Sequence, residues 1–436
     1  MNAAPDRLNV LSKTGAEQLL RSGSGSMATA RLGMPRKPIT ILLFGLFGVG
    51  NQGNDGSLEA MIEFLRRTRP DAQLICVCPR PDLVSAEFGI ASLPIRYSGY
   101  LRGLAGRLNH LLLKVPGKLI DLVETFNKVR KAGTMIIPGT GILDDFGERP
   151  FGMPLDIFKW CLAARIAGTR IAFVSIGAGP IHHPLSLWLM ISAAKLATYR
   201  SYRDHISKKF MESAGLDTDG DDVYPDIAFR LRAPDIPASA TPESRRLRVG
   251  VGVMSYHGWD AFADNGQTIF ETYVDKLARF VVHTLDGGHR VRLLTGESSD
   301  LRAVEALMAK VSAVRPNLQV SDIVAEPSNS LHDLMRQMSE VDLVVATRFH
   351  NIVCALKMGK PTISLGYARK NDVLMAEMGL GEFCQHIESF DVGTLIEQFS
   401  RLVSCRESHK RLIGDRVREF NERLDRQEES LLSKLI

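Results

Sequence analysis

Short apolar segments alternate with longer amphipathic segments along most of the chain. In the first half, segments rich in Val, Ile and Leu begin at Ile39 ("ITILLFG"), Gln73 ("QLICVC"), Thr134 ("TMIIPG") and Arg170 ("RIAFVSIG"). The pattern resumes at Leu247 ("LRVGVGV"), His289 ("HRVRLLTG"), Asp342 ("DLVVAT") and Lys360 ("KPTISL"). Such segments, separated by stretches of helix length, are typical of buried parallel strands in βα units. The chain is therefore predicted to be α/β, with two series of parallel strands.

The two series are separated by "LRAPDIPASATPESRRL" over residues 231–247, which contains three prolines and no apolar periodicity. This composition is typical of a linker between domains. We predict an N-terminal Rossmann-like domain over residues 39–230 and a C-terminal one over residues 248–400, with a ligand cleft at the carboxyl ends of both sheets. A length of 436 residues with 45% apolar content favours two domains over one.

The two ends of the chain carry different patterns. Residues 1–38 contain "RSGSGS" and no contiguous apolar segment, which predicts a flexible leader. Residues 401–436 are predicted to form a C-terminal helix, because Ile413, Val417, Phe420 and Leu424 recur at spacings of four and three. We expect this apolar face to pack across a domain. Coiled-coil pairing is the alternative, but the register spans too few heptads to favour it.

Charge and cysteine content narrow the class of protein. The formal charge is +5, and the first 38 residues carry six basic and two acidic residues, so the remaining residues are close to neutral. Because the positive charge lies mainly in the leader, no nucleic-acid partner is expected. The six cysteines lie apart without zinc-ligand spacing, which indicates reduced thiols, no metal site and a cytoplasmic protein. Residues 99–131 are amphipathic and basic. This stretch is predicted either to cover a sheet or to contact the inner face of the membrane peripherally.

The loop after the first predicted strand contains a G-x-G-x-x-G pattern at Gly48, Gly50 and Gly53. A helix predicted to begin near Ser57 would place its positive end near an anion. A dinucleotide would also require an acidic residue about 20 residues further on, and the next strand is followed by Arg80 instead. The alternative is a tight turn in which Asn54, Asp55 or Ser57 caps the helix.

A stronger signal lies at residues 344–380. Arg348, His350 and Asn351 follow the end of one predicted strand, and Arg369 and Lys370 follow the end of the next. Carboxyl ends of parallel strands share one sheet edge, so these side chains are expected to converge. Arg and Lys bind carboxylates and phosphates, and His exchanges protons near neutral pH. The pattern predicts a site for an anionic substrate with acid/base chemistry.

Several segments together resemble the polysaccharide pyruvyl transferase family. They are "GVGNQGNDG", "IIPGTGILDDF", "SIGAGPI", "YRDHIS", "YPDIAF" and "TRFHNIVCALKMGKPTISLGYARK", in the family's order over residues 39–385. The resemblance implies a GT-B-like fold. It also implies transfer of enolpyruvate from phosphoenolpyruvate to a sugar of a cell-surface polysaccharide or its precursor, which forms a pyruvate ketal.

The resemblance also implies roles for particular residues. His350 takes the catalytic position with Arg348 beside it, and Arg203, Arg348 and Lys370 bind phosphoenolpyruvate. The C-terminal domain is expected to be the donor side of the cleft. Asp55 is our candidate for a second acid/base, with Asp204 and Glu297 as other choices. Asn51, Asn54 and Thr140 are expected near the acceptor, on the N-terminal side. Phosphoenolpyruvate is a co-substrate, so no further cofactor is expected. The second substrate is a sugar acceptor, and a lipid-linked sugar is one of the forms that it can take.

Other interpretations remain open from the residues alone. One is a GT-B glycosyltransferase that uses a nucleotide sugar, and another is a catalytically silent sugar-binding protein. Individual residues also have structural alternatives: a surface ion pair for Arg203 with Asp204, a capping or core role for His350, a solvated Lys370 and a structural Glu297.

Overall fold

The strands of the chain form two parallel sheets. The computed structural model describes residues 39–97, 115–234, 246–259 and 264–435. The predicted leader (residues 1–38) and most of the predicted linker lie outside the described residues. We call residues 39–231 the N-terminal half and residues 246–435 the C-terminal half.

The N-terminal half holds a seven-stranded sheet in the order β3-β2-β1-β4-β5-β6-β7. Its strands are β1 (Thr40–Phe44), β2 (Gln73–Cys78), β3 (Ala91–Pro94), β4 (Thr134–Pro138), β5 (Arg170–Ile176), β6 (Tyr199–Tyr202) and β7 (Asp222–Val223). Its helices are α1 (Gln52–Thr68), α2 (Pro81–Phe88), α4 (Val115–Val129), α5 (Met153–Ala167), α6 (Pro184–Lys195), α7 (His205–Ser213) and the 3-10 turn η2 (Ile227–Arg230).

The C-terminal half holds a six-stranded sheet in the order β10-β9-β8-β11-β12-β13. Its strands are β8 (Arg248–Gly252), β9 (Arg290–Leu294), β10 (Ile323–Ala325), β11 (Leu343–Ala346), β12 (Thr362–Gly366) and β13 (Cys384–His386). Its α-helices are α8 (Gly266–Asp286), α9 (Leu301–Val314), α10 (Leu331–Ser339), α11 (Phe349–Lys357), α12 (Arg369–Glu377), α13 (Val392–Ser404) and α14 (Arg406–Lys434).

Both sheets have the same topology, and this topology positions the site. Each order reverses between its first and fourth strands, at β1 and β4 in one sheet and at β8 and β11 in the other. The loops that leave such a pair diverge to opposite sides and open a crevice at the carboxyl edge of the sheet. All residues of β4, β11 and β12 are buried, as expected for parallel strands covered on both faces. The predicted α/β class with two Rossmann-like sheets is confirmed.

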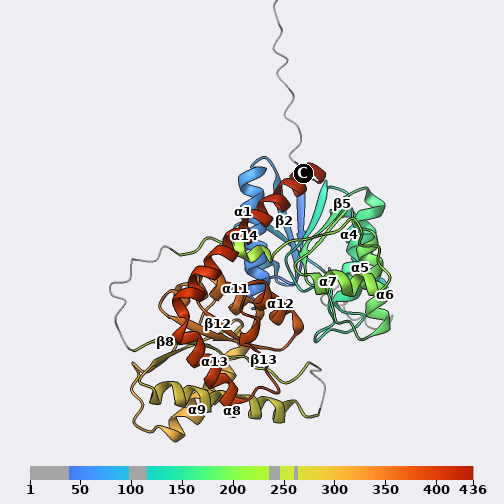
Figure 1. Cartoon of the computed structure of the whole chain (residues 1–436). Helices are drawn as coiled ribbons and strands as arrows, with labels where there is room; N and C mark the ends of the chain where they lie inside the picture. The colour runs from blue at the N-terminus through green and yellow to red at the C-terminus, as the bar shows by residue number, and fades with distance from the viewer. Residues whose placement is uncertain (1–38, 98–114, 235–245, 260–263, 436) are drawn as a thin grey trace, which may run out of the picture. The chain divides into compact units, whose positions relative to one another are not determined.

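The last helix, α14, connects the two halves. Its residues Ile413, Phe420 and Leu424 are buried, as the apolar spacing predicts. Gln427 Nε2 donates to the hydroxyls of Ser175 and Ser201 in the N-terminal half, at 2.8 and 3.0 Å. In Figure 1, α14 (red) runs past α11 and reaches the first sheet. The preceding helix, α13, crosses the predicted boundary at residue 400.

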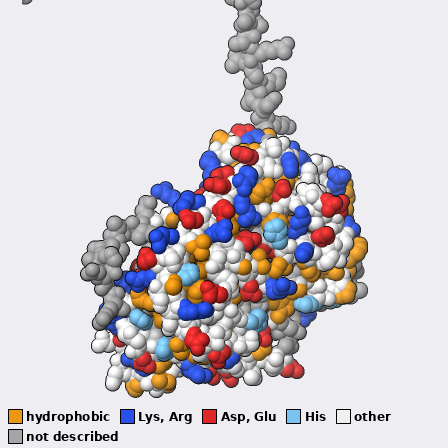
Figure 2. Space-filling view, viewed as in Figure 1, with side chains coloured by type: hydrophobic (Ala, Val, Ile, Leu, Met, Phe, Trp, Pro, Cys, Tyr) orange, Lys and Arg blue, Asp and Glu red, His pale blue; other side chains and the backbone are white. Residues whose placement is uncertain are grey.

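Surface features bear on the membrane prediction. Part of the basic amphipathic stretch, residues 98–114, lies outside the described residues. Its described part, α4, exposes Leu119, Leu122, Val123 and Phe126 at helical spacing along one face. Among the described residues, no helix is both long and apolar enough to cross a bilayer. Figure 2 shows Lys and Arg interspersed with Asp and Glu on the face that carries α14, and peripheral membrane contact stays a prediction.

Candidate active site

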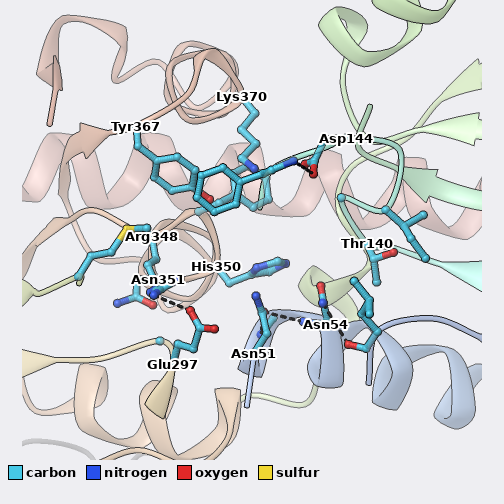
Figure 3. A pocket seen from close by; sticks show the side chains of 18 of the residues that line it. Asn51, Asn54, Thr140, Asp144, Glu297, Arg348, His350, Asn351, Tyr367 and Lys370 are labelled. Atoms are coloured by element: carbon cyan, nitrogen blue, oxygen red, sulfur yellow. Dashed lines mark hydrogen bonds and ion pairs between the residues drawn. The ribbon is translucent and has the colours of Figure 1, made fainter. Parts of the chain in front are cut away.

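A cavity of about 240 Å³ lies where the loops at the carboxyl edges of the two sheets meet. Figure 3 shows Thr140 and Asp144 on one side of it, Tyr367 and Lys370 on the other, and His350 between them. The cavity brings together every predicted site residue except Asp55, namely Asn51, Asn54, Thr140, Arg203, Arg348, His350 and Lys370. Residues predicted for the donor and for the acceptor side thus line one cavity.

The glycine-rich loop leads directly into α1, which begins earlier than predicted. The helix starts at Gln52, and the Asn51 side chain caps it by accepting hydrogen bonds from the backbone N–H groups of Gly53 and Asn54. The prediction of a start near Ser57, with Asn54, Asp55 or Ser57 as the cap, is therefore wrong. Gly48 (φ +72°) and Gly50 (φ +87°) adopt the left-handed conformation that favours glycine and permit the sharp turn before the helix.

The start of α1 is docked against the C-terminal half. Gln52 Nε2 donates to the carbonyl oxygen of Ser328 at 2.6 Å, and Asn51 pairs with Glu297 through the backbone. The His350 ring lies so close to Gly53 that a methyl group at this position would overlap it. A capped helix end covered by a histidine ring is not an open pyrophosphate site, and the loop instead supports His350.

Asp55 lies behind the glycine-rich loop rather than in the cavity. Its Oδ1 accepts a hydrogen bond of 2.8 Å from the backbone N–H of Gly48 and so ties the first turn of α1 to the loop. Burial raises the pKa of Asp55 to about 6, although the hydrogen bond from Gly48 acts in the opposite direction. The prediction that Asp55 is catalytic is therefore corrected to a structural role, because its carboxylate does not line the cavity that holds His350.

The raised pKa of Asp55 predicts a pH-dependent contribution to stability. Between about pH 4 and 6 the folded protein binds a proton at this carboxyl that the unfolded chain releases, so stability falls as the pH rises through this range. Asp55→Asn keeps the acceptor oxygen and removes the titration. The free energy of unfolding of the variant minus that of the wild type, measured by urea unfolding, should therefore increase from pH 4 to pH 7. A difference that is independent of pH would contradict this expectation.

His350 contacts a carboxylate of the other half. Its Nε2 is buried and lies 3.6 Å from Asp226 Oδ2. Burial alone would raise the pKa of Asp226, but the hydrogen bond and charge of His350, with the charge of Arg203, lower it. Nε2 faces Asp226, and Nδ1 lies against Gly53, where an added methyl group would overlap it. Sequence reasoning missed Asp226, although it lies in the "YPDIAF" segment.

Arg203 is buried beneath the cavity, with 4% of its side chain exposed, which excludes the surface ion pair considered above. Its guanidinium lies 3.5 Å from Asp226 and 3.7 Å from Asp204, and stacks on the Phe349 ring at 4.4 Å. A methyl group at Gly177 would overlap the guanidinium, so the glycine makes room for it. Arg203 is therefore a fixed cation in the cavity wall, and its two neighbouring carboxylates, at 3.5 and 3.7 Å, compensate its charge less closely than the 2.6 Å partners of Arg348 do.

Arg348 lines the cavity, but its charge is already compensated. Its Nε and Nη2 each donate to Asp300 at 2.6 Å, and Nη2 also lies 2.6 Å from Glu297 Oε2 (Figure 3). Burial would lower the pKa of Arg348, but the hydrogen bonds and charge of Asp300 and the charge of Glu297 raise it. Two carboxylates around one guanidinium indicate that Arg348 shapes the site, and the predicted donor-binding role is not favoured by this arrangement.

Lys370 stands opposite Asp144 across the cavity. Its Nζ lies 5.0 Å from the centroid of the Tyr367 ring, and no carboxylate of the described residues lies within ion-pair distance of it. Burial raises the pKa of Asp144, although the charges of Lys370 and Arg203 act in the opposite direction. Asp144 was not predicted as a site residue, and its only signal is that it is the first of the two adjacent aspartates in "GILDDF". A buried carboxyl with a raised pKa, in a cavity that also holds an ammonium group, is suited to proton transfer.

The N-terminus of α11 is a further anion-binding element. Its N-cap is Arg348, no side chain caps the helix, and its first turn carries no acidic residue. Unsatisfied N–H groups at a helix start attract anions. Nearby, Thr140 Oγ1 and the side-chain amide of Asn351 are buried and have no hydrogen-bond partner in the described part of the chain. Buried polar atoms of this kind are suited to receive a polar ligand.

The arrangement combines an anion site with a proton-transfer pair. Lys370, Arg203 and the α11 N-terminus provide positive potential, while His350 and Asp144 are titratable groups that line the same cavity. No cluster of three or more His, Cys, Asp or Glu side chains in the described ranges is placed to hold a metal ion. The cavity can therefore bind a small anion through the protein's own cations and exchange protons with it.

Comparison with solved structures identifies proteins that have a similar fold. Anabaena Alr3699/HepE, solved in complex with UDP-glucose, aligns with a TM-score of 0.57 and 13% identity over 91% of this chain and 100% of that chain. The UDP-GlcNAc 2-epimerase from Neisseria meningitidis, bound to UDP-GlcNAc, aligns with a TM-score of 0.54 and 12% identity over 89% and 99%. These likenesses concern the fold alone, and they confirm the GT-B-like architecture.

Comparison of sequences shows the family. The amylovoran biosynthesis protein AmsJ of Erwinia amylovora is 20% identical over 420 residues, which cover 86% of this chain and 97% of AmsJ. The model of the polysaccharide pyruvyl transferase family matches residues 51–369, a range that contains the glycine-rich helix start, Arg203, Asp226 and the β11-α11 segment with His350. The predicted resemblance is confirmed, and the chain belongs to the polysaccharide pyruvyl transferase family.

Proposed function

We propose that the protein transfers the enolpyruvyl unit of phosphoenolpyruvate to a sugar of a cell-surface polysaccharide or its precursor and forms a pyruvate ketal. The observation that carries this proposal is one cavity in which the His350–Asp226 pair lies beside an unpaired Lys370 and a buried Arg203. Family membership supports the reaction class, and the likeness to an amylovoran biosynthesis protein supports a surface polysaccharide.

The donor fits the positive side of the cavity. Phosphoenolpyruvate carries a carboxylate and a phosphate, roughly three negative charges in all near neutral pH. Lys370 has no competing carboxylate among the described residues, and the α11 N-terminus lies on the same wall. We assign phosphate and carboxylate binding to Lys370, Arg203 and these N–H groups, and a positioning role to Arg348.

The reaction balances without an oxidant or reductant. The methylene carbon of the donor takes a proton, and a sugar hydroxyl forms a bond to the neighbouring carbon. The C–O bond to phosphate then breaks, and a second hydroxyl of the same sugar takes its place. Each of the two sugar hydroxyls releases one proton. One of these protons restores the acid that protonated the methylene carbon, and the other leaves with inorganic phosphate.

Two groups suit the proton transfers. The His350 ring lines the cavity and contacts Asp226 through Nε2, and we assign to this ring the proton given to the methylene carbon. Asp144 takes the second acid/base role that the sequence had suggested for Asp55, because it lines the cavity and Asp55 does not. General acid and base catalysis of this type contributes about 10²–10⁴-fold to rate.

Donor binding is tested by thermal denaturation with phosphoenolpyruvate and without added divalent metal. A ligand that binds only the folded state raises the melting temperature. Lys370→Ala should weaken affinity by about 10- to 150-fold, the loss of one charged contact of roughly 1.5–3 kcal/mol. Lys195→Ala, at an exposed position on α6, is the matched control and should bind normally.

The same experiment separates the second candidate function. The chain is similar in fold to a protein solved with UDP-glucose. This likeness is the reason to test a nucleotide-sugar glycosyltransferase as the second candidate. Stabilisation by UDP-glucose but not by phosphoenolpyruvate would favour that function. Binding without turnover would favour the silent sugar-binding protein. A cytoplasmic location, at or near the inner face of the membrane, and a lipid-linked acceptor remain part of the proposal.

A further inference from the structure

A second cavity, of about 410 Å³, adjoins the one that holds His350. The two share a wall formed by Asp144, Arg203, Tyr367 and Lys370. The remaining lining comes mainly from residues 178–180, α7 and the start of α12. Its volume lies in the range of about 300–1,000 Å³ that is usual for small-molecule sites. A ligand in the second cavity would meet a ligand in the first at this shared wall.

The second cavity has an aromatic lining. Phe210 of α7 packs over Gly179, where a methyl group would overlap its ring. Trp259 and Tyr367 lie with ring centroids 6.5 Å apart on the opposite half of the chain. Large, rigid rings with a polar edge are suited to bind amphipathic ligands. A pyranose ring is such a ligand, because one of its faces presents C–H groups while its rim carries hydroxyls.

Asp204 provides a hydrogen-bond acceptor in this aromatic setting. The residue is 6% exposed and lines the cavity. Its Oδ1 caps α7 by accepting from Ser207 N at 2.6 Å, whereas Oδ2 has no hydrogen-bond partner in the described ranges and lies 3.7 Å from Arg203 Nε. A buried carboxylate oxygen left in this way can accept a hydrogen bond from a ligand hydroxyl.

The two cavities are lined by different charged groups, and this difference favours an anion in one cavity and an uncharged ligand in the other. Besides His386, the second cavity is lined by three acidic residues (Asp144, Asp204, Asp372) and three basic ones (Arg203, Arg369, Lys370), so carboxylates and Arg or Lys side chains are equal in number. The two helices that begin there carry their own carboxylates, Asp204 as the N-cap of α7 and Asp372 in the first turn of α12. The α11 start in the first cavity has none. An anion therefore favours the first cavity and an uncharged ligand the second.

We propose that the second cavity binds an uncharged hexopyranose ring of the acceptor, with Phe210, Trp259 and Tyr367 as its aromatic walls and Asp204 as a hydroxyl partner. This inference rests on the proposed pyruvyl transfer and specifies the acceptor's chemistry at this site. The hydroxyls that receive pyruvate then lie at the shared wall, beside Asp144 and the donor. A nucleotide diphosphate or a lipid chain is not the ligand of this cavity.

The probes are phenyl glycosides of glucose, galactose and mannose, and binding to the full chain is measured by ligand-observed NMR titration. At least one glycoside should bind, and Trp259→Ala and Phe210→Ala should each weaken its binding tenfold or more. Trp188→Ala, an exposed tryptophan on α6, is the matched control and should bind like the wild type. If Phe210→Ala does not fold, Trp259→Ala decides the result.

Three results would overturn the assignment: no glycoside binds, both cavity variants bind like the wild type, or UDP or decyl phosphate binds in a Trp259-dependent manner while the glycosides do not. Phosphoenolpyruvate affinity, measured on the same variants, should change less than twofold. Glycoside binding that depends on Trp259, in a protein that phosphoenolpyruvate does not stabilise, would support this cavity and refute the proposed donor. The reverse pattern would refute only the cavity assignment.

Discussion

Replacing His350 with alanine is expected to lower the rate of pyruvyl transfer by about 10² or more, while phosphoenolpyruvate affinity changes only a few fold. The reason is that the proposed reaction assigns the exchanged proton to His350 and the binding of the donor's charge to Lys370, Arg203 and the α11 N-terminus. The measurement is the release of inorganic phosphate at saturating donor and sugar, together with donor affinity from thermal denaturation.

Asp226 and Gly53 test the same histidine indirectly. Asp226→Asn keeps the shape of the contact but removes the charge that faces Nε2, so the pH profile of the rate should shift along with its magnitude. Gly53→Ala should displace the His350 ring and lower the rate without removing any charged group. His283→Ala, an exposed position on α8, is the matched control and should leave the rate unchanged.

Near-normal turnover of the His350→Ala variant would refute the catalytic assignment. If the variant failed to fold, the residue would instead serve the core, as the sequence alone allowed. If rate and donor affinity both fell, His350 would have both roles. The pH dependence of the single-turnover rate would then separate them.

Replacing Arg348 with alanine is expected to destabilise the protein by about 3–5 kcal/mol, the usual cost of leaving a buried partner charge uncompensated. Asp300 is fully buried and receives two hydrogen bonds of 2.6 Å from Arg348. Its other donors are the backbone N–H groups of Ser255 and Gly296, which cannot replace a positive charge. The measurement is urea unfolding at neutral pH, with phosphoenolpyruvate affinity determined in parallel.

The control for Arg348 is an exposed ion pair. Arg401 and Glu382 lie 2.9 Å apart with more than half of each side chain exposed, so Arg401→Ala should change stability by about 0–1 kcal/mol. Arg348→Ala combined with Asp300→Ala should recover part of the loss, because the buried charge is also removed. A stable Arg348→Ala protein with strongly weakened donor binding would show that Arg348 binds the donor directly, as first predicted from the sequence.

The sequence by itself determined the fold class and several of the residues that line the cavity. Continuous apolar segments specify strands buried on both faces, and the chemistry at their carboxyl ends is local in sequence. For this reason His350 and Lys370 were predictable: each lies at or just inside the start of the helix that follows its strand, α11 after β11 and α12 after β12. The family resemblance added Arg203, which lies at the end of β6.

Only the tertiary structure decided which charges remain available to a ligand. Asp226 reaches His350 from the other half of the chain, Asp300 and Glu297 neutralise Arg348, and Asp144 meets Lys370 across the cavity. These partners lie tens to more than two hundred residues away from one another in the sequence. A charged side chain has the same sequence pattern whether it is paired or free, whereas its electrostatic potential depends on the distance to its partners. The position of Asp55 was also decided by the tertiary structure. Helix α1 begins at Gln52, so the Asp55 carboxylate accepts a hydrogen bond from Gly48 and does not line the cavity.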